Sequence, residues 1–180
     1  MRNMPQERRP QMSAQPQTMS TRATLLLAGE QSVRIDVHGA REHGARLILG
    51  WATLMLTVSA ADQVHALLDA YTDARPAAGQ LPAEVDPAIL TVNVGDEAYL
   101  PAIAVTYRDI PRCTTTPYTT GPDGPGGWAH QRRVLHIHAG VLLFRIFDQL
   151  AWSSMVDMLT NAAEIADVAL PPTAGDAMQP

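Results

Sequence analysis

The chain has 180 residues, a net charge of -5 and one cysteine, and all of its 13 basic side chains are arginine. A chain of this length can bury a full core, so folding requires neither a metal ion nor a disulfide, and one cysteine excludes an intramolecular disulfide. The longest uncharged stretch, residues 47–61, is shorter than the about 20 apolar residues that a membrane-spanning helix needs. We therefore expect a protein of a reducing cytoplasm, and the arginine-only, alanine-rich composition indicates a high-GC bacterium.

Both ends of the chain lack hydrophobic periodicity. Residues 1–21 are rich in Gln, Pro, Met and Arg, and residues 171–180 are rich in Pro and Ala. Such segments cannot bury enough apolar surface to fold, so we predict a disordered basic arm and a disordered tail. The rest of the chain is acidic.

The first folded unit is expected over residues 22–76. Four short runs alternate or are continuously apolar, as in strands, and they cover 23–28, 32–38, 45–50 and 52–58. A helix follows, because the next apolar residues recur with helical spacing. These residues are Val64, Leu67, Leu68 and Tyr71.

A second unit is expected over residues 88–170, after a linker at 77–87 that is rich in Ala, Pro and Gly. Its predicted strands cover 88–94, 98–108, 132–138 and 141–147. A closing helix has one apolar face formed by Trp152, Met155, Val156 and Leu159.

The two units align with each other at an offset of 88 residues. Residues 54–74 then match 142–162 without a gap, and the apolar positions of one helix meet those of the other. Either an ancestral duplication or similar patterning alone would give this match. Both predict an α+β fold of two pseudo-repeated ββββα units, with antiparallel sheets and helices packed on one face.

The sequence HIHAG places two histidines on the same side of a predicted strand. Because side chains alternate along a strand, His136 and His138 point the same way and could chelate zinc or iron. Such a site needs a third ligand, and no second ligand motif is present. Distant candidates are Asp36, His38, His43 and His130. We expect instead two half-exposed histidines on a sheet surface, with no cofactor.

The segment 111–131 is predicted to be a long loop between strands. Loops of this length inside a domain are uncommon and are often functional. It carries two aromatic residues and is followed at once by two arginines, so it could bind a partner; the alternative is a mobile insertion. The predicted partner-binding residues are Tyr118, Trp128, Arg132 and Arg133.

The C-terminal part carries a loose motif of about 30 residues. Its members are Gly140, Val141, Asp148, Ala151, Trp152, Ala162 and Ala163. This run resembles the ends of small proteins encoded on actinobacterial plasmids and integrative elements. The resemblance implies a cytoplasmic accessory protein of a high-GC Gram-positive bacterium or its mobile DNA, and it implies no catalytic activity.

No phosphate-binding loop, nucleophile elbow or paired-cysteine metal motif is present in the sequence. We therefore expect a non-enzymatic interaction or accessory module that binds a protein partner or a second copy of itself. One alternative is a small metal-dependent enzyme that uses His136 and His138. The other is a nucleic-acid accessory factor that uses the basic N-terminal arm, although the acidic body argues against nucleic acid.

Overall fold

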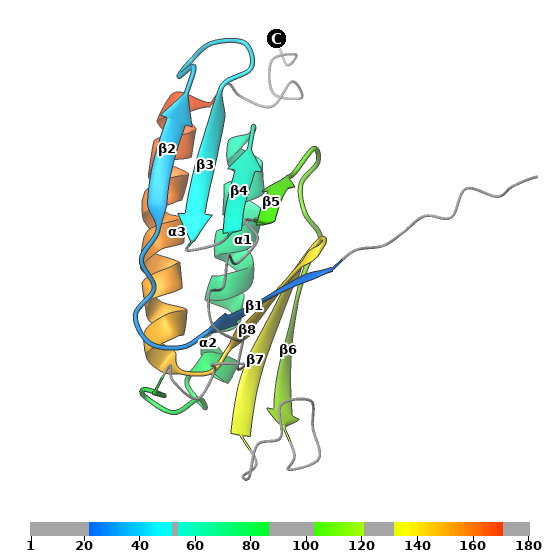
Figure 1. Ribbon diagram of the computed structural model, residues 1–180, viewed down its shortest axis with the longest axis vertical. Coiled ribbons are helices and arrows are strands. Elements are labelled where there is room, and N and C mark those ends of the chain that lie inside the picture. The colour runs from blue at the N-terminus through cyan, green and yellow to red at the C-terminus, as the bar shows by residue number, and fades with distance from the viewer. Residues whose placement is uncertain (1–21, 52–53, 87–102, 121–131, 171–180) are drawn as a thin grey trace, which may run out of the picture.

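The computed structural model describes residues 22–51, 54–86, 103–120 and 132–170 (Figure 1). The predicted strand 88–94, the terminal segments and Trp128 lie outside these residues. In chain order the elements are β1 (Ala23–Leu27), β2 (Arg34–His38), β3 (Arg46–Trp51), β4 (Leu54–Val58), α1 (Ala61–Asp73), α2 (Arg75–Ala78), β5 (Ile103–Thr106), β6 (Cys113–Thr120), β7 (Arg132–Ala139), β8 (Leu142–Ile146) and α3 (Gln149–Ala169).

The strands form two four-stranded sheets, and each half of the chain gives one strand to the sheet of the other half. Sheet A has the order β1-β8-β7-β6 and sheet B has the order β2-β3-β4-β5. The fold class is α+β, as predicted. The prediction of purely antiparallel sheets is wrong, because β1 pairs with β8 and β5 pairs with β4 in parallel. The alternation of apolar and polar residues along a strand determines which face of the sheet each side chain occupies. It does not determine which other strand pairs with it.

Strand pairing in the two sheets follows one pattern. Leu47 pairs with Val58, and Leu135, 88 positions after Leu47, pairs with Ile146. The predicted offset therefore relates the two hairpins residue by residue. The exchanged strands correspond too, since Ala23 pairs with Leu142 in sheet A and Ile103 with Leu54 in sheet B. An ancestral duplication stays a prediction.

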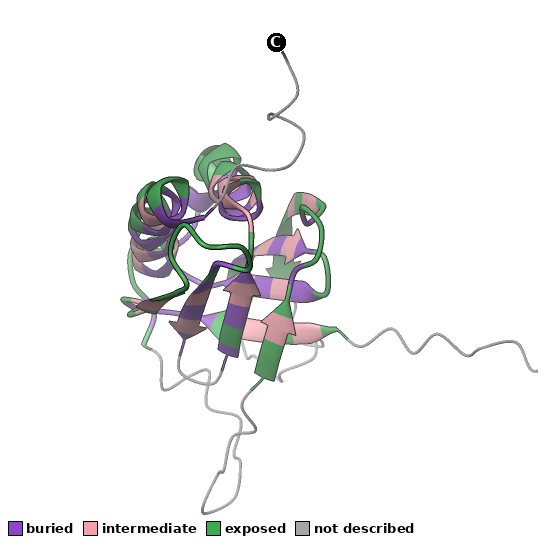
Figure 2. Ribbon diagram, turned by 90° about the horizontal axis from the view of Figure 1, so that it is seen from above, coloured by how far each residue is buried: buried purple, intermediate pink, exposed green. Residues whose placement is uncertain are grey.

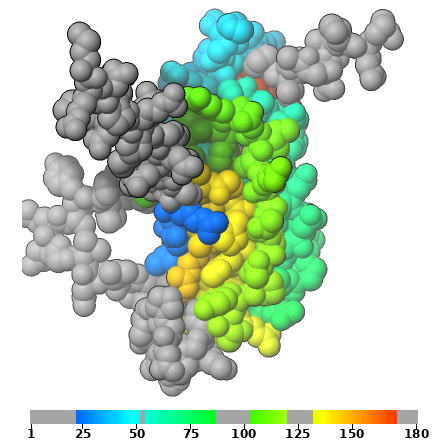
Figure 3. Space-filling model, turned by 90° about the vertical axis from the view of Figure 1, so that its right-hand side faces the viewer, coloured from blue at the N-terminus to red at the C-terminus, as the bar shows by residue number. Residues whose placement is uncertain are grey.

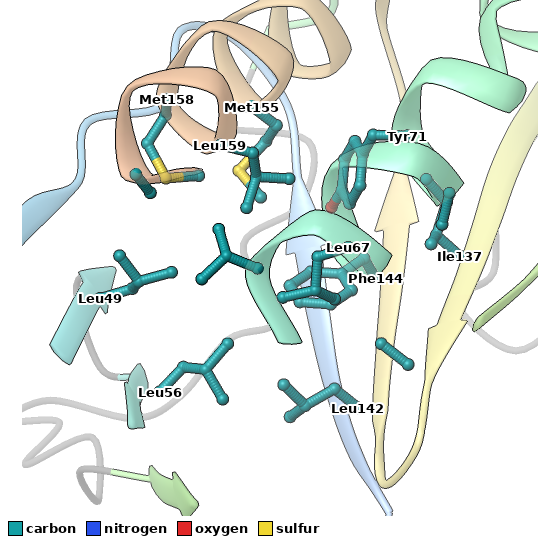
Figure 4. Close-up of a cluster of buried hydrophobic side chains, with 14 of the residues drawn as sticks. Leu49, Leu56, Leu67, Tyr71, Ile137, Leu142, Phe144, Met155, Met158 and Leu159 are labelled. Carbon is teal, nitrogen blue, oxygen red and sulfur yellow. The ribbon is translucent and has the colours of Figure 1, made fainter. Parts of the chain in front are cut away.

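The helices form a second layer over the inner faces of both sheets (Figure 2). Like the strands, each helix contacts the sheet of the other half. Helix α3 packs on β3 of sheet B, and α1 packs on β6 and β7 of sheet A as well as on β4. The two helices also contact each other. One hydrophobic core therefore joins both halves (Figure 4). The inward face of β7 and β8 lies in this core, with at most 1% exposure at Leu135, Ile137, Leu142, Phe144 and Ile146.

Asp148 anchors one exchanged strand. Its side chain is fully buried and accepts hydrogen bonds from three backbone amides. These belong to Ala151 in the first turn of α3 at 2.7 Å, Gly29 after β1 at 2.8 Å and Val85 at 3.0 Å. A buried carboxylate is tolerated when such donors surround it, so this residue joins β1, α3 and the chain before β5.

Gln63, the third residue of α1, has a similar role in the first half, although the N-cap position that Asp148 occupies in α3 is taken there by Ala60. Gln63 is 2% exposed, and its Oε1 accepts from the Ser59 amide at 2.9 Å. Its Nε2 donates to the carbonyls of Tyr107 at 3.2 Å and Asp109 at 3.4 Å, just after β5. Each exchanged strand is thus tied to a helix start by one buried polar side chain.

The segment predicted as a linker is packed onto the start of α3. Leu81 and Val85 are buried, and Gln149 donates from its backbone amide to the Pro82 carbonyl at 2.9 Å. Val85 joins Val134 and Phe147 in a second small apolar cluster. This cluster covers one end of the outer face of sheet A, the face turned away from the helices.

The prediction of a loop over 111–131 is wrong for its first part. Residues Cys113–Thr120 form β6, which pairs antiparallel with β7 along its whole length. Threonine and tyrosine favour strands. Pro117 removes one backbone donor, which an edge strand tolerates. The remainder, residues 121–131, lies outside the described part of the chain.

We expect Asp148→Ala to lower the free energy of unfolding by about 3–5 kcal/mol, because three buried amides lose their acceptor and α3 loses its N-cap. Urea denaturation monitored by circular dichroism measures this loss. The control is Asp157→Ala, an exposed position on the same helix, which should change stability by less than about 0.5 kcal/mol. Equal effects of the two substitutions would contradict the anchoring role.

Candidate functional site

The outer face of sheet A gathers several of the residues singled out from the sequence. His136 lies between Thr116 of β6 and Arg145 of β8, and His138 is the next side chain of β7 on the same face. We call Tyr118, His136, His138 and Arg145 the histidine face. Figure 3 shows the surface on which β6, the β7–β8 pair and β1 lie side by side, with α1 beyond β6.

Ring contacts hold this face together. Tyr118 stacks on His136, with ring centroids 4.9 Å apart and an interplanar angle of 17°. His136 meets His138 edge to face at 6.3 Å. The Arg145 guanidinium lies 5.8 Å from the ring of Phe147, a cation–π contact. The pattern predicted that the two histidines share a face, and the structure confirms it.

Two nitrogen atoms on this face are buried without a hydrogen-bond partner: Nε2 of His136 and Nε of Arg145. Buried polar atoms of native proteins are nearly always bonded, so such a pair calls for an explanation. Burial lowers the pKa of His136, and the neighbouring Arg145 and His138 lower it further. At neutral pH His136 is therefore mainly neutral.

The surroundings of the histidine pair do not fit a metal ion well. Among the described residues no group of three potential ligands exists. Asp36 and His38 belong to β2 in the other sheet, and His130 lies outside the described chain. Arg145, paired directly with His136, places a positive charge where a cation would bind.

The predicted arginines take different positions. Arg133 donates from Nη1 to Oε1 of Gln80 at 3.1 Å and so turns toward the chain after α2. A hollow of about 280 Å³ opens there, and Tyr118, Arg133 and Gln80 contribute to its lining. Arg132 is half-buried at the start of β7. The structure thus brings Tyr118 and Arg133 to one hollow, while Trp128 is outside the described residues.

A second surface feature, a shallow groove beside α3, was not predicted from the sequence. Arg75 lies over the Trp152 ring at 5.9 Å, and both residues line two adjoining hollows of about 350 and 310 Å³ with Ser153. The helical period placed Trp152 on the core face. It is only half-buried, and its indole Nε1 donates to the Tyr71 carbonyl at 2.9 Å.

A third group of chemically interesting side chains lies in the core. The Tyr107 hydroxyl donates to the Ala139 carbonyl at 2.7 Å, whereas the Tyr71 hydroxyl is buried without a partner. Burial raises the pKa of both tyrosines and of Cys113. A raised thiol pKa disfavours the thiolate, so these groups are poor candidates for catalysis at neutral pH.

The residues of the C-terminal motif have structural roles in this fold. Gly140 has a φ of +58° in the turn between β7 and β8, where a side chain would be strained and would meet the Tyr107 ring at 3.4 Å. Asp148 caps α3, and Ala162 and Ala163 are buried. The motif therefore describes a helix start and its packing.

No protein family profile matches this chain, and no curated protein and no solved structure is significantly similar to it. Among the described helices, none combines the length and apolarity needed to cross a bilayer.

Acidification should destabilise the protein through His136. Its folded-state pKa is lowered, so the unfolded chain takes up the proton first as pH falls. The stability contribution is complete above pH about 6.5, the unperturbed histidine value, and is lost as pH falls through the folded pKa. The urea midpoint should fall between pH 7.5 and 5.5, and His136→Phe, which keeps the stacking ring, should reduce that fall. The exposed His43→Phe should leave it unchanged; an equal effect of both would contradict the assignment.

Tyr71→Phe should keep or raise stability. The hydroxyl is buried without a hydrogen bond, so removing it costs no bond and removes a desolvation penalty of about 1 kcal/mol or more. Tyr107→Phe, which loses the bond to Ala139, should instead destabilise by about 1 kcal/mol. Thermal unfolding of both variants provides the comparison, and a clear loss in Tyr71→Phe would reveal a partner for this hydroxyl.

Proposed function

We propose that this protein is a non-enzymatic interaction module of the bacterial cytoplasm, and that its binding surface is the outer face of sheet A. The observation that carries the proposal is the histidine face. Aromatic rings, an arginine and exposed apolar groups meet there on a rigid sheet, and Tyr118 is 43% exposed. Tyrosine and arginine are enriched at protein interfaces.

The neighbouring surface supports a protein partner. Leu26 of β1, on the same face, is 37% exposed, and Val141 in the β7–β8 turn is 46% exposed. The hollow shared by Tyr118 and Arg133 adjoins the other end of this strand pair. Contiguous apolar and aromatic groups rimmed by polar side chains are typical of interaction sites.

Both alternative functions have weaker support. A metal-dependent enzyme would need a third ligand near His136 and His138, and the described residues provide none. A nucleic-acid factor would depend on the basic arm at 1–21, which lies outside the described residues, and the net charge of -5 opposes binding to a polyanion. The resemblance to proteins of mobile elements fits an accessory role.

Native mass spectrometry of untagged protein tests self-association and metal binding together. If the partner is a second copy, we expect an oligomer of integral mass without metal, and Tyr118→Ala should shift it toward monomer. One zinc or iron per chain, lost in a His136→Ala, His138→Ala double variant, would replace the proposal with the metal-enzyme hypothesis.

If the protein is a monomer, peptide display tests whether it binds a different protein. Selected peptides should bind the wild type and Val168→Ala, an exposed change on α3 (62% exposed), and lose binding to Tyr118→Ala. If the protein is a monomer and selection returns no binder, the proposed function is wrong.

A further inference from the structure

The correspondence between the sheets provides an internal reference for the histidine face. At the 88-residue offset, His136 corresponds to Ile48 and Arg145 to Thr57. Each pair occupies the same position in the same strand register. The scaffold therefore accepts plain apolar and hydroxyl side chains at these places, and the histidine and arginine of sheet A are not required by the fold.

The charges of the two outer faces differ in a further way. On sheet B, Arg34 forms an ion pair with Asp36, two residues along β2, at 2.8 Å, and a second arginine of that face, Arg46, lies opposite His38. On sheet A, the four strands contain no aspartate or glutamate. Among the described residues Arg145 has no acidic partner; it contacts the Phe147 ring, and its Nε has no hydrogen bond there.

The face of sheet A is thus positive on a protein whose net charge is -5. An unpaired arginine and an unpartnered imidazole side by side form a site for an anion, because both supply N–H donors and arginine matches a carboxylate bidentately. Because both nitrogens are buried, a ligand reaches them only if the two side chains rotate. Charge complementarity therefore favours a negatively charged partner.

We propose that the outer face of sheet A docks an acidic segment of a partner protein, with a carboxylate of that segment bound by Arg145 and the adjacent histidines. This inference rests on the proposed interaction function and specifies the partner's chemistry. A nucleic acid is disfavoured because a long polyanion also meets the acidic remainder of the molecule, whereas a short segment meets the local charge.

Binding should strengthen as pH falls. Protonation of a histidine beside the bound carboxylate adds a favourable charge pair, and the carboxylate stays ionised down to pH about 4.5. The described groups that face His136 are Tyr118 of β6, Arg145 of β8 and His138 of its own strand. Glu84 and Asp86 flank Val85, which clusters with Val134 and with Phe147, the ring that Arg145 contacts, so both acids are near this end of the face.

The test uses the full ¹⁵N-labelled chain titrated with a decaglutamate peptide at pH 5.5 and 7.5, followed by amide chemical shifts. We expect shifts confined to β1, β6, β7 and β8, and an affinity at least about threefold higher at pH 5.5. Decalysine should produce no saturable shift in these four strands. An oligothymidine of ten nucleotides should bind more weakly than decaglutamate.

Matched variants complete the design. Arg145→Thr installs the residue found at the corresponding position of sheet B and should weaken binding by about fivefold or more. Arg34→Thr removes the same charge from the outer face of sheet B and should change affinity less than about twofold. His136→Ile, again the sheet B residue, should abolish most of the pH dependence and provides a second variant if Arg145→Thr does not fold.

Three results would overturn the inference: shifts located elsewhere or absent, equal effects of Arg145→Thr and Arg34→Thr, or tighter binding of the oligothymidine. Display peptides that bind at the Trp152 groove would leave the interaction function standing and remove only the acidic-segment inference. A monomer without any peptide ligand removes the interaction function itself.

Discussion

The fold depends on one buried charge, the carboxylate of Asp148. Three backbone amides from separate parts of the chain converge on it, which places β1 beside β8, starts α3 and fixes the chain that follows α2. The first half solves the same problem with a different residue at a different position. The N-cap of α1 is Ala60, and Gln63, three residues further on, accepts from the amides of Ser59 and Ala60 and donates to the carbonyls after β5, which a carboxylate cannot do.

Much of the local structure could be predicted because it follows from periodicity. The inward face of β7 and β8, the shared face of His136 and His138, and the 88-residue register all depend on alternation within single strands or one hairpin. The exchange of β1 and β5 could not be predicted, because no pattern in an apolar strand identifies which distant strand it will join. β6 was missed because its threonines, tyrosine and proline lack an apolar period, and an edge strand needs none.

Only part of the candidate site could therefore be predicted from the sequence. The two histidines were found as a pair, but their neighbours come from other strands. Tyr118 had been assigned to a loop, and its stacking on His136 requires β6 to be a strand. Arg145 joins the site from β8, and its lack of an acidic partner among the described residues is a property of the assembled sheet. The outer faces of sheets A and B share one strand pattern but differ in side-chain chemistry at a few positions. A partner would distinguish the two faces by these positions.

The strand exchange also constrains how the chain can be made. Ala23 of β1 pairs with Leu142 of β8, so β1 has no partner strand until β8 has been synthesised. Sheet B likewise lacks β5 until the second half has been synthesised. Contacts this distant in sequence slow folding, and unpaired strand edges are prone to aggregation while they wait. A fragment that ends between α2 and β5 would contain a nearly complete first half and still have no finished sheet, so the elements from β1 to α3 form one folding unit.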